Sequence, residues 1–192
     1  NNSTIIIENC ILNNNSGQAI CVFNNSTLIV KNCILNNNSG QAIVAFNECD
    51  VSIINCTIVN NYQGINLFPS CSLSVANTIL INDSGEITGS TTTVSVSHSN
   101  IEGGWEGGWE VEENIDADPL FCNPDSGDYT LAENSPCLGT GQDGANMGAY
   151  GIGCEAIHLN PVIVDIPDTT INEDEDLLIT LSAESQPGYS MT

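Results

Sequence analysis

The chain has 192 residues with 24 Asp and Glu against a single basic residue, Lys31, and its formal net charge is −23. This charge excludes nucleic acid as a partner, because phosphate contacts need lysine and arginine. The hydrophobic fraction of 41% favours a globular chain. No apolar run approaches the ~18–20 residues that cross a bilayer, so we expect no membrane insertion.

The first 90 residues are four copies of one unit, which begin at residues 1, 24, 47 and 69. The octapeptide NNNSGQAI stands at 13–20 and again, unchanged, at 36–43. A degenerate fifth copy follows at 91–105. Self-similarity at a period of about 22–23 residues predicts a solenoid, in which each unit stacks on the next.

Within each unit, β-branched and polar residues alternate, as in STLIV (26–30), DVSII (50–54) and SLSVA (72–76). This alternation indicates strands, and it predicts two apolar columns on one inward face. The columns are Ile5, Leu28, Val51 and Leu73, and Ile7, Val30, Ile53 and Val75. Short strands separated by polar turns, about three to a unit, describe the coil of a parallel β-helix.

Each coil adds about 4.8 Å along the axis, so residues at equivalent positions lie above one another. We expect an asparagine ladder at a strand corner, formed by Asn9, Asn32, Asn55 and Asn77. We also expect an aromatic column of Phe23, Phe46 and Phe68, and a column of small core thiols, Cys10, Cys33 and Cys56. The thiol column lacks the Cys-x-x-Cys pair or neighbouring His that metal binding favours. Cys122, Cys137 and Cys154 do not share the spacing and could include one disulfide.

After residue 102 the repeat gives way to NIDADPLF (114–121), GDYTLAENSPCL (127–138) and MGAYGIGC (147–154). These motifs, with NCTIVNN at 55–61, resemble the secreted bacterial right-handed parallel β-helix proteins of the pectate-lyase-like superfamily. The resemblance implies an all-β fold, a right-handed parallel β-helix with a C-terminal cap. It also implies an extracellular or cell-surface bacterial protein that is often large and multidomain.

Four regions are predicted on this basis. Residues 1–105 form the coils, and 106–154 form a cap that protects the open sheet edge of the last coil. Residues 155–160 form a linker. Residues 161–192 resemble the first strands of an Ig-like or cadherin-like repeat, but they are too few for a complete sandwich.

Catalytic residues are not predicted in any of these regions. Lyases of this superfamily use a strong base, commonly Arg or Lys, and here Arg is absent and Lys31 occupies a repeat column. Hydrolysis needs two carboxylates across a groove, and the coils hold neither an Asp-Asp pair nor a Gly-His-Gly motif. His98 stands where the asparagine ladder would continue, and His158 lies in the linker, so we expect structural roles for both.

Two features could bind a ligand. The tandem EGGWEGGW (102–109) places Trp105 and Trp109 on a glycine-rich excursion, where Trp could stack on sugar rings or fold back over the open end of the coil. The second feature is a set of acids that could hold structural Ca²⁺ or simply cap turns in solvent: Glu112, Asp116, Asp118, Asp125 and Asp128. The tail acids at 173–176 raise the same alternatives.

The sequence therefore predicts a non-catalytic structural or adhesive module of a larger secreted or cell-surface bacterial protein, of which this chain is a piece. The alternative is a carbohydrate-binding or carbohydrate-active β-helix that uses Trp105, Trp109 and nearby acids. Possible partners are a polysaccharide or a cell-surface glycan, and further domains of the same chain. No cofactor is predicted apart from the calcium considered above.

Overall fold

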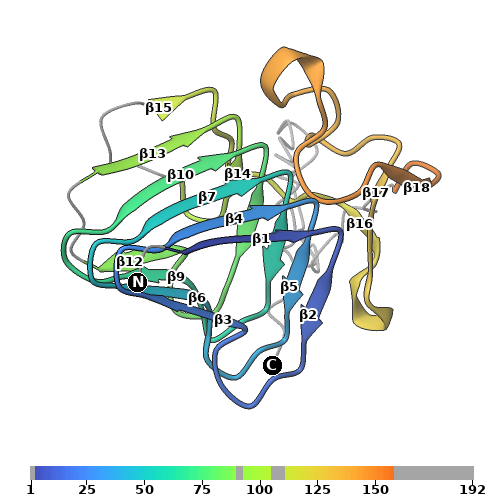
Figure 1. Cartoon of the computed structure of the whole chain (residues 1–192). Helices are drawn as coiled ribbons and strands as arrows, with labels where there is room; N and C mark the ends of the chain where they lie inside the picture. The colour runs from blue at the N-terminus through green and yellow to red at the C-terminus, as the bar shows by residue number, and fades with distance from the viewer. Residues whose placement is uncertain (1–2, 90–92, 105–110, 158–192) are drawn as a thin grey trace, which may run out of the picture. The chain divides into compact units, whose positions relative to one another are not determined.

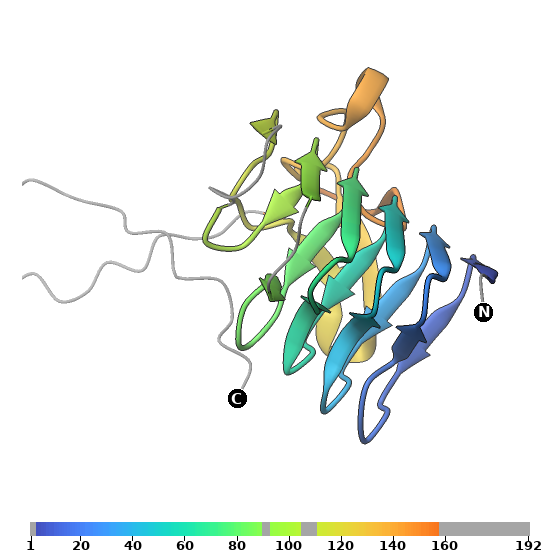
Figure 2. The same cartoon turned by 60° about the vertical axis from the view of Figure 1, so that its left-hand side comes forward.

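The computed structural model describes residues 3–89, 93–104 and 111–157. These residues form a solenoid of parallel strands whose coils stack one on another (Figures 1 and 2). The predicted linker from His158 onward and the predicted Ig-like segment 161–192 lie outside the described residues. The part of the chain that the structure describes contains no helix long and apolar enough to cross a membrane.

Three parallel sheets form the walls of the solenoid, and each of the first four coils contributes one strand to each wall. The first sheet contains β1 (Thr4–Glu8), β4 (Thr27–Lys31), β7 (Asp50–Ile54), β10 (Ser72–Ala76), β13 (Thr93–Ser97) and β15 (Val111–Glu112). The second contains β2 (Ile11–Asn13), β5 (Ile34–Asn36), β8 (Thr57–Val59), β11 (Ile79–Ile81) and β14 (Asn100–Ile101). The third contains β3 (Ile20–Phe23), β6 (Gln41–Phe46), β9 (Gln63–Leu67) and β12 (Ile87–Gly89).

The two apolar columns predicted from the repeat are confirmed. Leu28 pairs with Ile5 on one side and Val51 on the other, and Val30 pairs likewise with Ile7 and Ile53. These columns join inward residues of the other two walls in one continuous core. Burying a Leu, Ile or Val side chain contributes about 1.5–3 kcal/mol, so the core supplies the main driving force for stacking.

Asparagine at the corners has a conformational reason. After each strand of the first sheet, the chain turns through a residue in the left-handed region, with φ between 48° and 55°. The residues at this corner are Asn9, Asn32, Asn55, Asn77, His98 and Glu113. Asn adopts this conformation more readily than most other L-residues, which explains why it recurs there.

The coiled region extends further than predicted. Strand β15 pairs in parallel with β13, and Ile115 forms a bridge with Asn100. These contacts add a sixth, partial coil from residues that the sequence placed in the cap. The sequence does not reveal this coil, because the glycine-rich EGGWEGGW stretch lies between β13 and β15 and interrupts the 22–23-residue period.

The described residues that follow this coil, 117–154, pack beside the solenoid. They form a small sheet of β16 (Phe121–Asn123), β17 (Asp128–Ala132) and β18 (Ile152–Cys154), with 3-10 turns η1 (Pro124–Ser126) and η2 (Gln142–Gly144). Tyr129 and Leu131 pack with Ile34, Val59 and Ile79 on the outer face of the second sheet. Described residues that were expected to close the last coil therefore cover the flank of the second, third and fourth coils (Figure 1). Outward-facing Ile and Val on short strands make this flank apolar.

Candidate functional site

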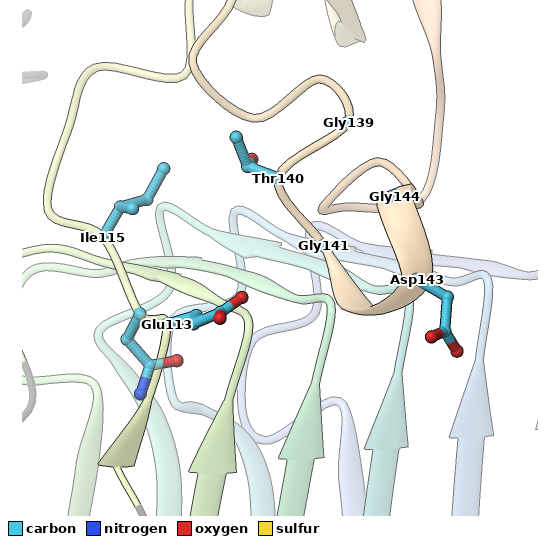
Figure 3. Close-up of a pocket in the computed structure, with 8 residues that line it drawn as sticks. Glu113, Ile115, Gly139, Thr140, Gly141, Asp143 and Gly144 are labelled. Carbon is cyan, nitrogen blue, oxygen red and sulfur yellow. The ribbon is translucent and has the colours of Figure 1, made fainter.

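We call residues 117–154, which pack beside the solenoid, the flanking region. A shallow groove lies between the sixth coil and the loop 139–144 of this region. Glu113, Asn114 and Ile115 form one wall, and Gly139–Gly144 forms the other, around a volume of about 440 Å³ (Figure 3). Thr140 and Ile115 line the upper part of the groove, and the Asp143 carboxylate points away from Glu113. The groove is large enough for a small polar ligand.

The charged side chains at this groove are acidic, apart from one histidine beside it. Glu113 is exposed, and its Oε2 lies 3.3 Å from Nε2 of His98, whose side chain is 14% exposed. The other ring nitrogen, Nδ1, is buried without a hydrogen-bond partner among the described residues. His98 and Glu113 occupy adjacent positions of the left-handed corner column. Their pairing therefore continues that column, as expected from the position of His98 in the repeat.

A second acidic site lies at the corner that follows the second sheet. Glu86 is buried, whereas Asp83, Glu102 and Asp116 are exposed. Burial, followed by the nearby charges of Glu102 and Asp83, raises the pKa of Glu86 to about 7, although hydrogen bonds from Asn82 oppose the shift. Partial burial, followed by Asp116 and Asp83, also raises the pKa of Glu102. We call these four residues the acidic corner.

One residue of the acidic corner, Glu102, is close in sequence to the predicted carbohydrate-binding tryptophans. Glu102 precedes Trp105 by three residues, but Trp105 and Trp109 themselves lie outside the described residues. The side chain of Glu112 is likewise not described. The sequence gives no sign that Asp83 and Glu86 lie near Glu102 and Asp116, since the two pairs stand about 16–33 residues apart and only coil stacking brings them together.

The predicted calcium ligands that the structure describes make separate local contacts. Asp118 Oδ1 accepts a hydrogen bond of 2.9 Å from the backbone N–H of Leu120, and Asp128 Oδ1 accepts from the N–H and hydroxyl of Thr130. Asp125 lies in η1, and Asp116 belongs to the acidic corner. Among the described residues, no group of three or more His, Cys, Asp or Glu side chains could hold a metal ion.

Three of the four asparagines predicted to form the corner ladder are linked by side-chain hydrogen bonds. Asn32 Nδ2 is 3.4 Å from Asn9 Oδ1, and Asn55 Nδ2 is 3.3 Å from Asn32 Oδ1, both on the surface. Asn77 instead accepts a hydrogen bond of 2.7 Å from the backbone N–H of Gln142. The fourth member of the column therefore helps to anchor the flanking region.

Cys33 and Cys56 of the predicted thiol column are buried as expected, whereas Cys10 in the first coil is exposed. Cys33 Sγ accepts a hydrogen bond of 3.4 Å from the backbone N–H of Cys10. Later in the column, Thr78 and Ser99 supply hydroxyl oxygens that accept from the N–H groups of Cys56 and Thr78. Thiol and hydroxyl are interchangeable here, because each is a small acceptor for the backbone of the preceding coil. Of the three C-terminal cysteines, Cys122 and Cys154 form a disulfide. Cys137 is a buried thiol that accepts a hydrogen bond from Asn100 Nδ2.

A second asparagine ladder lies at the next corner, within the NNN runs. Asn15, Asn38, Asn61 and Asn82 stack inside the corner after the second sheet, with side-chain hydrogen bonds of 2.7–2.9 Å between neighbouring coils. Its signal was present, since the last residue of each NNN run recurs at 23 residues. The sequence alone did not separate it from the neighbouring Asn14 and Asn37, which are left-handed turn residues.

Comparison with known families identifies this architecture. The family described as "Right handed beta helix region" matches residues 1–116. The chain belongs to this right-handed β-helix family. The matched range ends at the sixth coil of the β-helix, where the flanking region begins. No curated protein and no solved structure matches this β-helix.

Proposed function

We propose that this β-helix is a non-catalytic module that serves as a rigid spacer or adhesive face in a larger secreted or cell-surface bacterial protein. The observation that carries the proposal is the role of the repeated residues. The repeated apolar, Asn and Cys side chains contact their copies in the next coil. The repeat is thus explained by stacking, without a ligand.

Stacking of this kind favours stiffness along the axis. Buried polar groups inside a protein need partners, and Asn15, Asn38 and Asn61 of the buried ladder each donate to the asparagine of the next coil. Bending the solenoid would break these hydrogen bonds and open the core together. The outer face of the first sheet carries polar residues where its strands begin, such as Thr27, Asp50 and Ser72, and also the exposed Ile6. Such a mixed face is suited to broad contact with polar and apolar groups.

A polysaccharide panel tests the non-catalytic part of this proposal. The chain is incubated with neutral and acidic polysaccharides, and new reducing ends and unsaturated uronates are measured. We expect neither product. Turnover that is lost in Glu102→Gln and retained in Asp125→Asn, an exposed acid of the flanking region, would overturn the proposal.

The acidic corner favours carbohydrate binding as a second candidate function. Glu102 places an exposed carboxylate three residues before Trp105, and carboxylates beside aromatic rings are suited to sugar hydroxyls and ring faces. A glycan array with titration of any hit tests it. Saturable binding that is lost in Trp105→Ala and kept in Tyr62→Ala, an exposed aromatic residue elsewhere, would support this function. Equal binding by both variants would contradict it.

Structural calcium at the predicted acids is a separate proposal with its own test. An ion that binds only the folded state raises the melting temperature as its concentration increases. The chain is melted in millimolar CaCl₂ and in chelator, with MgCl₂ as the ionic-strength control. A rise specific to calcium that is lost in Asp118→Asn supports the site, and equal melting in calcium and chelator removes it.

A further inference from the structure

The three thiols of the thiol column share one orientation. Each Sγ donates to the carbonyl oxygen two residues earlier in the chain: Cys10 to Glu8 O at 3.1 Å, Cys33 to Lys31 O at 3.0 Å and Cys56 to Ile54 O at 3.2 Å. The side chains therefore repeat from coil to coil together with the backbone. Consecutive sulfur atoms of the column consequently lie about one coil apart, which is about 4.8 Å, the spacing of paired strands.

The backbone fixes this spacing at Cys10 and Cys33. The two cysteines stand between two hydrogen bonds that join their coils, from Asn9 N–H to Lys31 O at 3.1 Å and from Ile34 N–H to Cys10 O at 2.9 Å. The backbone N–H of Cys10 also donates to Cys33 Sγ at 3.4 Å. The main chain thus holds the two side chains in register and directs one N–H donor at the Cys33 sulfur.

The first thiol of the column is open to solvent. Cys10 is exposed, whereas Cys33 and Cys56 are buried. An ion that reaches the Cys10 sulfur therefore meets the sulfur of Cys33 in the next coil. Cys21 is also exposed but lacks such a neighbour, because the residue paired with it in the next coil is Val44.

Two thiols that lie one coil apart suit one class of metal ion. A metal–thiolate bond is about 2.3 Å long, so an ion midway between two sulfurs needs them about 4.6 Å apart. The coil spacing of about 4.8 Å meets this requirement. Structural zinc needs four ligands and calcium at least six oxygens, but no group of three or more His, Cys, Asp or Glu side chains among the described residues could hold a metal ion. Soft ions such as Cu(I) prefer thiolates and accept two of them in a line.

We propose that Cys10 and Cys33 form a linear, two-coordinate site for a soft monovalent metal ion such as Cu(I), held between the first and second coils. On binding, each thiol releases its proton to solvent and gives up its contact with a carbonyl oxygen, and two metal–sulfur bonds form. The ion keeps its oxidation state. One ion and two thiolates carry one net negative charge, which is stabilised by water at Cys10 and by the N–H directed at Cys33. The site operates independently of the proposed spacer role and of carbohydrate binding.

The same column shows which variants keep the coil intact. Thr78 and Ser99 occupy its later positions, and their hydroxyl oxygens accept backbone N–H groups as Cys33 Sγ does. Serine therefore fits the coil at positions 10 and 33, but a neutral hydroxyl is a poor ligand for a soft ion. Cys10→Ser and Cys33→Ser are expected to fold as the unaltered chain does. Cys21→Ser, which removes the other exposed thiol, is the matched control.

Titration with Ag(I), a redox-inert substitute for Cu(I), tests the site. The whole chain is titrated in chloride-free buffer, bound ions are counted by native mass spectrometry, and circular dichroism checks the fold of each variant. We expect one ion to bind first. Cys10→Ser and Cys33→Ser should each weaken its binding about a hundredfold, at least as much as the loss of an outer partner of a metal ligand. Cys21→Ser should bind it unchanged.

A second measurement uses the unaltered chain and so stays valid if a serine variant fails to fold. One equivalent of Ag(I) is expected to slow alkylation of Cys10 by iodoacetamide about tenfold or more, because the thiolate is the reactive form, and to leave Cys21 reactive. X-ray absorption of the chain loaded with Cu(I) without oxygen should show two sulfur ligands.

Three results would overturn the proposal. The first is equal affinity for Ag(I) in the unaltered chain and in Cys10→Ser. The second is a first ion that persists when both cysteines are replaced, which would place it at other thiols, such as the buried Cys49 and Cys71. The third is protection of Cys21 rather than Cys10 from alkylation.

Discussion

The side-chain amide of Asn36 donates a hydrogen bond of 3.2 Å to the hydroxyl of Tyr129, which lies 93 residues further along the chain. The ring of Tyr129 is buried against the second sheet and stands edge-on to Phe121, with centroids 5.2 Å apart. One side chain thus gives the flanking region both an apolar contact and a polar anchor on the solenoid.

Removing the Tyr129 hydroxyl separates these two contributions. Tyr129→Phe leaves the buried amide of Asn36 without its partner and is expected to cost about 1–2 kcal/mol. Tyr129→Ala also removes the ring and is expected to cost about 3–5 kcal/mol. Urea unfolding followed by circular dichroism measures both free energies. Equal values for the two variants would show that the ring contributes nothing to docking.

Gly148 allows the flanking region to approach the second sheet. A Cβ at this position would lie 2.8 Å from Ile79 Cδ1, whereas a Cβ at Gly139 meets no atom within 4 Å. Both residues have positive φ, so both alanine variants carry about 1–2 kcal/mol of backbone strain. We expect Gly148→Ala to cost about 1–3 kcal/mol more than Gly139→Ala in urea unfolding, because it also overpacks the interface. Equal costs would contradict the close approach.

The two asparagine ladders differ in burial and should differ in energetic value. Asn61→Ala leaves the N–H and Nδ2 of Asn38 without an acceptor in a buried site, and we expect a loss on the order of 3 kcal/mol. Asn32→Gly retains the left-handed corner and removes two exposed, longer hydrogen bonds, so we expect a loss below about 1 kcal/mol. Comparison of their urea midpoints checks this order, and a larger loss for Asn32→Gly would refute it.

Thiol reactivity reports which cysteines are enclosed by the coils. Cys10 and Cys21 are exposed, whereas Cys33, Cys56 and Cys137 are buried, and burial raises the pKa of Cys137 to about 11. A colorimetric disulfide reagent is expected to modify two thiols quickly, because the thiolate is the reactive form. Seven thiols should react in denaturant and nine after reduction of Cys122–Cys154. Fast modification of most thiols in the native protein would contradict the stacked core.

The sequence by itself determined the coils. A period of 22–23 residues and strand alternation specify which residues stack and which face inward, as for Leu28 and Val51. This works because every coil repeats the same short-range choices, and stacked copies experience the same environment. Resemblance in the C-terminal motifs added the handedness.

The tertiary structure alone decided three further features. It selected Asn38, rather than its neighbour Asn37, for the buried ladder, and it ended that ladder at Glu86. It also placed Tyr129 on the flank of the solenoid. The contacts of Glu86 and Tyr129 occur once, so no repeat marks them. Asn37 and Asn38 recur with the same period, so the period does not tell which of the two is buried. These contacts are set by packing between segments far apart in the chain, where burial and hydrogen-bond satisfaction are decided together.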